Sequence, residues 1–130
     1  MIDGLARRDF GARMNAKIIL LLESDHDTRS ALYELLAGEG YQIFEAANAD
    51  QAQIILNKMP AVRVVIASLG VSEFECEGLV FEQIRSVRPE ASIILVSSNP
   101  ELFSVANEYQ VAAIRKPFDV IQLFELIQAV

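Results

Sequence analysis

The sequence predicts an α/β domain in which five parallel strands form one doubly wound sheet between two layers of helices. Five short apolar runs alternate with five segments of helical periodicity, the links between them are short, and polar residues follow the apolar runs. A parallel strand that is buried on both faces has a continuous apolar sequence. Consecutive βα units form right-handed crossovers. We therefore expect a three-layer α/β/α architecture with (βα)5 order.

The first βα unit is predicted from an unbroken apolar run, Ile18–Leu22, which is followed by a helix from about Asp27. Gly38 and Gly40 end this helix, because glycine readily adopts the backbone conformation that terminates helices. The second strand is predicted over Tyr41–Ala46. The apolar stripe of the first helix consists of Leu32, Leu35 and Leu36.

The middle of the chain repeats this alternation. Asn48 is a helix cap, and Pro60 ends the helix that it begins. The third strand is predicted over Val64–Ala67, and a loop rich in glutamate leads from it to a helix over Leu79–Val87. The fourth strand is predicted over Ser92–Val96.

The last two helices have clear start signals. Asn99-Pro100-Glu101 combines a cap, a proline at the first helical position and an acid in the first turn. The fifth strand is predicted over Val111–Ile114, and Asp119 caps the final helix. The inward stripe of that helix is predicted to be Val120, Leu123, Phe124 and Ile127.

Composition limits the function classes. The 130 residues are 52% hydrophobic and carry a net charge of −7, so one domain with a full core is expected, and neither nucleic acid nor membrane is a direct partner. The lone Cys76 excludes an intrachain disulfide, which is typical of a cytoplasmic protein. Residues 1–16 form an N-terminal extension that we expect to be frayed, and residues 17–130 form the domain.

Polar residues follow four of the five predicted strands. In doubly wound sheets the ligand site lies beyond the carboxyl ends of the strands, where the strand order reverses. The residues at those ends are Glu23, Ser24 and Asp25, then Ser68, then Ser97 and Ser98, and finally Lys116.

This order of residues resembles the receiver domain of bacterial two-component response regulators, which has a flavodoxin-like fold. Receivers carry an acidic pair after the first strand, a phosphoacceptor Asp after the third, a Ser or Thr after the fourth and a Lys-Pro after the fifth. Here Glu23 and Ser24 lie at the acidic pair, Ser68 at the acceptor and Ser97 at the hydroxyl, and Lys116-Pro117 matches outright. The resemblance covers the chain from residue 17 to its end.

The departures from the receiver pattern predict a pseudo-receiver that lacks phosphoryl chemistry. Phosphotransfer requires a carboxylate nucleophile beside a Mg²⁺ ion that further carboxylates hold. Ser68 and Ser24 remove two of the three carboxylates that the resemblance implies. We therefore expect no catalytic residue, no cofactor, and Mg²⁺ binding that is weak or absent.

Other interpretations of these residues remain open. A shifted register would bring Glu23 and Asp25 together in the pocket, and Asp25-His26-Asp27 is a weak candidate for a metal site. The rival functions are a small α/β enzyme or nucleotide- or ligand-binding module that uses the same crevice, and a receiver that retains weak metal or phosphate binding. Against the enzyme, no glycine-rich phosphate loop and no G-x-S-x-G motif follows any strand.

The predicted working surface lies on the last two helices. Phe103, Ile121 and Leu126 point away from the inward stripes of their helices and form a candidate patch for a protein partner or for self-association. The run Glu73–Glu77, which contains Cys76, is a second candidate for partner contact.

Two more expectations rest on the resemblance to receivers. It implies that the Lys116–Pro117 bond is cis and that Lys116 points into the crevice. It also implies that the aromatic residue that receivers use as a switch is replaced by Ala113.

Overall fold

The computed structural model describes residues 17–70 and 77–130, and it confirms the predicted architecture. Five parallel strands form one sheet in the order β2-β1-β3-β4-β5, with helices between consecutive strands. The elements are β1 (Ile18–Glu23), α2 (His26–Gly38), β2 (Gln42–Ala46), α3 (Ala49–Lys58), β3 (Val64–Ser68), α5 (Glu77–Val87), β4 (Ser92–Ser97), α6 (Leu102–Tyr109), β5 (Ala112–Arg115) and α7 (Val120–Ala129). Two predictions, on the extension 1–16 and on the loop that contains Cys76, lie outside the described residues.

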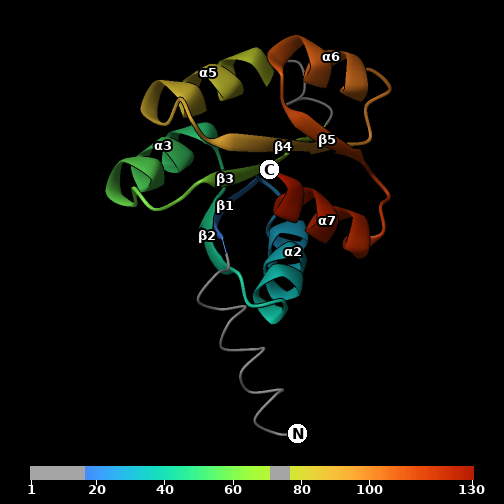
Figure 1. Ribbon diagram of the computed structural model, residues 1–130, viewed down its shortest axis with the longest axis horizontal. Helices are drawn as coiled ribbons and strands as arrows, with labels where there is room; N and C mark the ends of the chain where they lie inside the picture. Colours follow the sequence, from blue (N-terminus) through green and yellow to red (C-terminus); the bar gives the residue numbers. More distant parts are fainter. Residues whose placement is uncertain (1–16, 71–76) are drawn as a thin grey trace, which may run out of the picture.

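The sheet separates two hydrophobic cores. Figure 1 shows α2 and α7 on one face of the sheet and α3, α5 and α6 on the other. Alternate residues of each strand enter opposite cores, so that Leu20 packs beneath α3 and α5 while Leu21 packs beneath α2 and α7. Because β1, β3 and β4 are covered on both faces, their sequences are continuous apolar runs.

The strand order reverses between β1 and β3, since the chain moves from β1 outward to β2 and then returns to the other side. Glu23 at the end of β1 lies opposite Ser68 at the end of β3, and Ser68 lies opposite Val96 of β4. Ser97 lies opposite Arg115 at the end of β5. The register therefore brings the polar residues that follow the strands to one edge of the sheet.

The helix starts confirm two predicted caps, change one and add one that the sequence analysis did not name. Asn48 and Asp119 cap α3 and α7 through their side chains, and Asp25, one residue ahead of α2, caps that helix. The cap predicted at Asn99 is wrong: the side chain of Asn99 accepts from the N–H of Glu101 in a tight turn, and α6 begins at Leu102. Asparagine forms such turns as readily as it caps helices, so the sequence signal is ambiguous.

A buried arginine, Arg88, holds the end of α3 against the end of α5. Its guanidinium donates to the backbone carbonyl of Leu56 at 2.7 Å and to that of Pro60 at 3.1 Å, and also to the carbonyl of Val62. The carbonyls at the end of a helix have no partner within the helix, so a buried cation supplies their hydrogen bonds. Arg88 is therefore structural.

Lys17 brings the start of β1 to the end of α7. Its Nζ donates to the carbonyl of Ile127 at 2.7 Å and also to that of Val130. A cation is favourable there, because the last carbonyls of a helix carry partial negative charge. Among residues 17–70 and 77–130, no helix has the length and apolar character needed to cross a membrane.

Candidate functional site

The centre of the site is the buried carboxylate of Glu23, which is 4% exposed at the end of β1. The hydroxyl of Ser68 donates to its Oε1 at 2.6 Å, and the backbone N–H of Asp25 donates to its Oε2 at 2.9 Å. The ammonium of Lys116 lies 3.7 Å from Oε1. Both oxygens of the carboxylate are therefore engaged by groups of the chain itself.

Lys116 is aimed at this carboxylate by the turn that follows β5. The Lys116–Pro117 peptide bond is cis, as predicted. The backbone N–H of Lys116 donates to the carbonyl of Ser97 at 3.0 Å, which holds the turn against β4. The prediction that Lys116 points into the crevice is also confirmed, because its side chain reaches Glu23 and remains 30% exposed.

The two serines at the ends of β3 and β4 are buried and hydrogen-bonded. Ser68 donates to Glu23, and the hydroxyl of Ser97 accepts from the N–H of Asn99 at 3.1 Å. Ser68 therefore lies at the end of β3, opposite Glu23 in the β1–β3 register, and carries a neutral hydroxyl.

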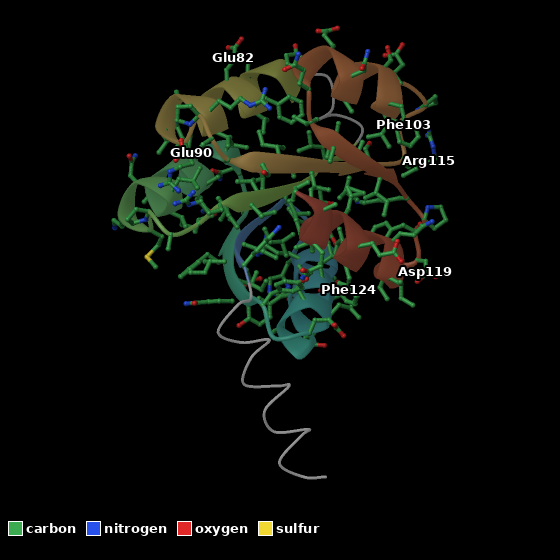
Figure 2. The ribbon with its side chains drawn as sticks, viewed as in Figure 1. Glu82, Glu90, Phe103, Arg115, Asp119 and Phe124 are labelled. Carbon is green, nitrogen blue, oxygen red and sulfur yellow. The ribbon has the colours of Figure 1, made fainter. Side chains whose placement is uncertain are left out.

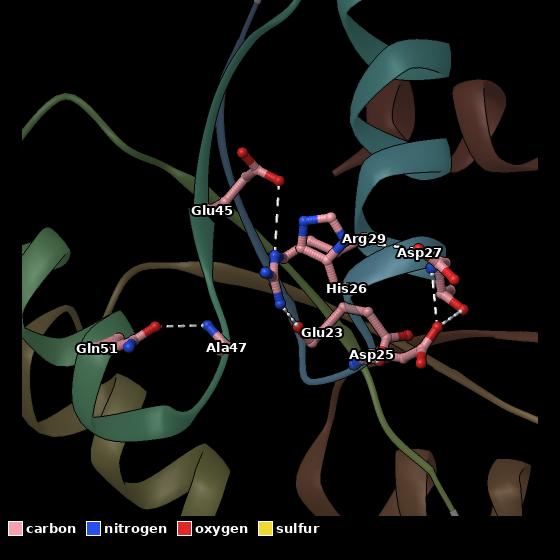
Figure 3. A network of polar contacts seen from close by, with 9 residues as sticks. Glu23, Asp25, His26, Asp27, Arg29, Glu45, Ala47 and Gln51 are labelled. Carbon is pink, nitrogen blue, oxygen red and sulfur yellow. Dashed lines mark hydrogen bonds and ion pairs between the residues drawn. The ribbon is translucent and has the colours of Figure 1, made fainter.

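The other residues of the predicted acidic pocket, Ser24 and Asp25, are exposed. Asp25 accepts from both the N–H and the hydroxyl of Thr28, at 2.9 and 2.7 Å (Figure 3). The hydroxyl bond, followed by the N–H bond, lowers the pKa of Asp25 below its ordinary value of 3.8. The alternative register is therefore wrong, because Asp25 caps α2 instead of joining Glu23.

Arg29 is a site residue that the sequence did not reveal. Its Nη1 donates to the carbonyl oxygen of Glu23 at 2.7 Å, and its Nε lies 3.6 Å from a carboxylate oxygen of Glu45 on β2 (Figure 3). Arg29 thus fixes the backbone at the end of β1. A signal existed, since an arginine one turn into α2 is within reach of that strand end.

The donor set does not suit Mg²⁺, which prefers several oxygen ligands of which carboxylates supply the charge. Within residues 17–70 and 77–130, no cluster of three or more His, Cys, Asp and Glu side chains is arranged to hold a metal. Glu23 is the one buried carboxylate of the described chain, and its oxygens already contact Ser68, Asp25 and Lys116. His26 and Asp27 are exposed and 3.5 Å apart.

A small pocket lies beside Glu23, between the ends of β1 and β3 and the start of α3, with a volume of about 280 Å³. The described residues that line it are uncharged, and they are Leu22, Ser24, Ala47, Asn48, Ala49, Ser68, Leu69 and Val80. This lining offers no cation for a phosphate group and no carboxylate for a metal.

The three residues of the predicted surface patch do not form one surface. Phe103 and Leu126 line a groove of about 700 Å³ between α6 and α7, together with Arg115, Ala113 and Glu125; we call this the α6–α7 groove. Figure 2 shows Phe103 beside Arg115, whose guanidinium carbon lies 5.1 Å from the ring centre.

The third residue of the predicted patch, Ile121, is 59% exposed and lines a different groove, between α2 and α7. Leu126 also packs against the core. The helical pattern showed correctly that Phe103 and Ile121 point outward. It could not show that Phe103 lines the groove between α6 and α7 whereas Ile121 lines the groove between α2 and α7.

Comparison with known proteins finds similarity to response regulators. No protein-family model matches the chain. Putative NtrX-like response regulators of Rickettsia bellii and Rickettsia typhi are each 29% identical over 114 residues, which is 85% of this chain and 24% of each relative. The chain thus spans about a quarter of the length of these curated relatives.

Solved structures agree on the fold. The receiver domain of the hybrid histidine kinase CckA matches with a TM-score of 0.68 at 23% identity, over 85% of this chain and 95% of that domain. Vibrio cholerae CheY4 gives 0.70 at 21% identity, over 88% and 98%. NtrX from Brucella abortus, in a complex with ADP, gives 0.74 at 24% identity, over 88% of this chain and 26% of NtrX. The chain has the CheY-type fold, and the names of its relatives support a receiver domain of a response regulator.

Proposed function

We propose that this chain is a receiver-like signalling domain of a two-component or related pathway that acts by protein–protein interaction without being phosphorylated. The fold and the names of the relatives support the signalling role. The single observation that supports the loss of phosphorylation is the contact between Ser68 and Glu23, in which a hydroxyl stands where an acceptor carboxylate is expected and donates to the one buried carboxylate of the described site.

With this contact, neither the nucleophile nor the metal ligand that phosphoryl transfer needs is available. An acyl phosphate forms when a carboxylate oxygen attacks phosphorus, and Ser68 has no carboxylate. The metal that stabilises the transferred group needs free oxygen ligands, whereas Glu23 is bonded to Ser68 and to the N–H of Asp25 and paired with Lys116. Glu23 could accept the Ser68 proton, but Ser68 is buried at the wall of the small pocket, which hinders the approach of a phosphoryl donor to its oxygen.

A constitutive interaction would use the α6–α7 groove. Its lining combines an exposed aromatic residue, Phe103, with a cation, Arg115, and an anion, Glu125. Exposed aromatic residues and arginine are enriched at protein interfaces, and opposite charges on one surface allow it to pair with itself around a two-fold axis. A second copy or a signalling partner is therefore the proposed ligand of this face.

The test is exposure of the full chain to acetyl phosphate and Mg²⁺, followed by intact-mass measurement before and after hydroxylamine. We expect no gain of a phosphoryl group. A gain that hydroxylamine removes would show an acyl phosphate, and a gain that resists hydroxylamine and maps to Ser68 would show phosphoserine; either result would overturn the proposal. The matched control is the double variant Ser24→Asp/Ser68→Asp, which returns both carboxylates.

A further inference from the structure

The α2–α7 groove is a second surface, which shares Glu125 and Ala129 with the α6–α7 groove used in the proposed function. It has a volume of about 460 Å³ and is lined by Glu39, Tyr41, Ile121, Phe124, Glu125, Gln128 and Ala129. Tyr41 and Phe124 form its floor with ring centres 6.5 Å apart, and Figure 2 shows Phe124 on the side of α7 that faces α2. The Gln128 side chain donates to the Tyr41 hydroxyl at 2.6 Å and fixes that floor.

The rim of this groove carries negative charge above an apolar floor. Of the described residues that line it, the charged ones are Glu39 and Glu125, and both are exposed. Ile121, at 59% exposure, adds an uncovered apolar side chain. A segment that combines arginine with large apolar residues complements such a surface, because its cations meet the rim while its apolar side chains reach the floor.

We propose that the N-terminal segment of the same chain, Met1–Ala16, binds in the α2–α7 groove. Its net charge is opposite in sign to that of the domain. The segment carries Arg7, Arg8 and Arg13 against two aspartates, for a net charge of +1, whereas the other 114 residues carry −8. It also contains large apolar residues between and around its arginines. These are Ile2, Leu5, Phe10 and Met14.

The point of attachment favours this occupant over a free partner. The segment joins the domain at Lys17, whose ammonium bonds the carbonyls of Ile127 and Gln128 in the last turn of α7. Gln128 is itself part of the groove. Sixteen residues span about 24 Å as a helix and about 53 Å when extended, against about 15 Å for the ten residues of α7. The tether therefore reaches the whole groove and supplies the segment at high effective concentration.

The test uses a spin label on the segment in the full chain. Cys76→Ser removes the native thiol, Ala6→Cys carries the label, and ¹⁵N spectra are compared before and after the label is reduced. We expect strong, label-dependent broadening of the amide signals of Glu39, Ile121 and Gln128. The broadening should fall in 1 M salt, where the Debye length shrinks to about 3 Å, and in the variant Glu39→Lys.

The control is Glu34→Lys, which makes the same change of net charge at an exposed position of α2 that does not line the groove. This control should leave the broadening in place. Broadening confined to residues next to Lys17 in sequence, or equal loss in both variants, would overturn the proposal. So would broadening that appears when labelled and ¹⁵N-enriched molecules are mixed, because the occupant would then be the segment of a second copy. None of these readouts depends on phosphorylation or on the α6–α7 groove.

Discussion

The pair formed by Glu23 and Lys116 is best tested by a double-mutant cycle, with Glu23→Gln, Lys116→Met and the combined variant. At 3.7 Å and an effective dielectric constant of about 20, Coulomb's law gives an attraction of about 4–5 kcal/mol. Desolvation of the two ions opposes this attraction, and Lys116 stays 30% exposed, so solvent screens part of it. We expect a coupling energy of about 1–3 kcal/mol.

The assay is urea unfolding of the four proteins at pH 7, with the coupling energy taken from the four free energies of unfolding. Lys116→Met should be more destabilising than the combined variant, because it leaves the carboxylate of Glu23 buried with only the Ser68 hydroxyl and the Asp25 N–H. A coupling below about 0.5 kcal/mol, the range of exposed pairs, would refute the view that this pair replaces a metal site at the centre of the pocket.

Four further predictions concern the surface and the helices. Phe103→Glu should abolish association through the α6–α7 groove and change the free energy of unfolding by less than about 1 kcal/mol, whereas Ile54→Glu, at the same 54% exposure on α3, should leave association intact in sedimentation. Gly78→Ala should destabilise the domain by about 1–3 kcal/mol, because its Cβ would lie 2.6 Å from a tyrosine hydroxyl of α6. Gly38→Ala meets no atom within 4 Å and should stabilise α2 by about 0.5–1 kcal/mol in thermal unfolding. Because folding lowers the pKa of Asp25, its contribution is present above pH 3.8 and is lost as the pH falls below that value, so Asp25→Asn should flatten the pH dependence of stability in acid.

The sheet could be predicted because its signals are local. The runs in β1, β3 and β4 are apolar without interruption, since helices cover both faces, and Asp119 and Asn48 cap helices through bonds to residues two or three positions ahead. The direction of Lys116 was instead predicted from the resemblance of Lys116-Pro117 to receivers, and its side chain does reach Glu23.

The hydrogen bonds that Ser68 and Arg88 make could not be predicted, because they join residues far apart in sequence. The bond from Ser68 to Glu23 spans 45 positions, and Arg88 reaches carbonyls 26 to 32 positions away. Sequence periodicity showed that Ile121 points outward, but the choice between two grooves depends on how α7 crosses the sheet relative to α2 and α6. Helical periodicity carries no information on that crossing.

The contact of Lys17 with the last turn of α7 has a consequence for how this unit can be joined to others. The side chain of Lys17 donates to the backbone carbonyl of Val130, so residues 17 and 130 are neighbours at the edge of the sheet where the strands begin. Glu23, Ser68 and Lys116 lie at the opposite edge. Domains whose ends lie close together tolerate insertion into another protein and circular permutation. A neighbour fused at either end would therefore leave from the same side of the molecule, and the strand-end pocket would stay open to a partner in trans.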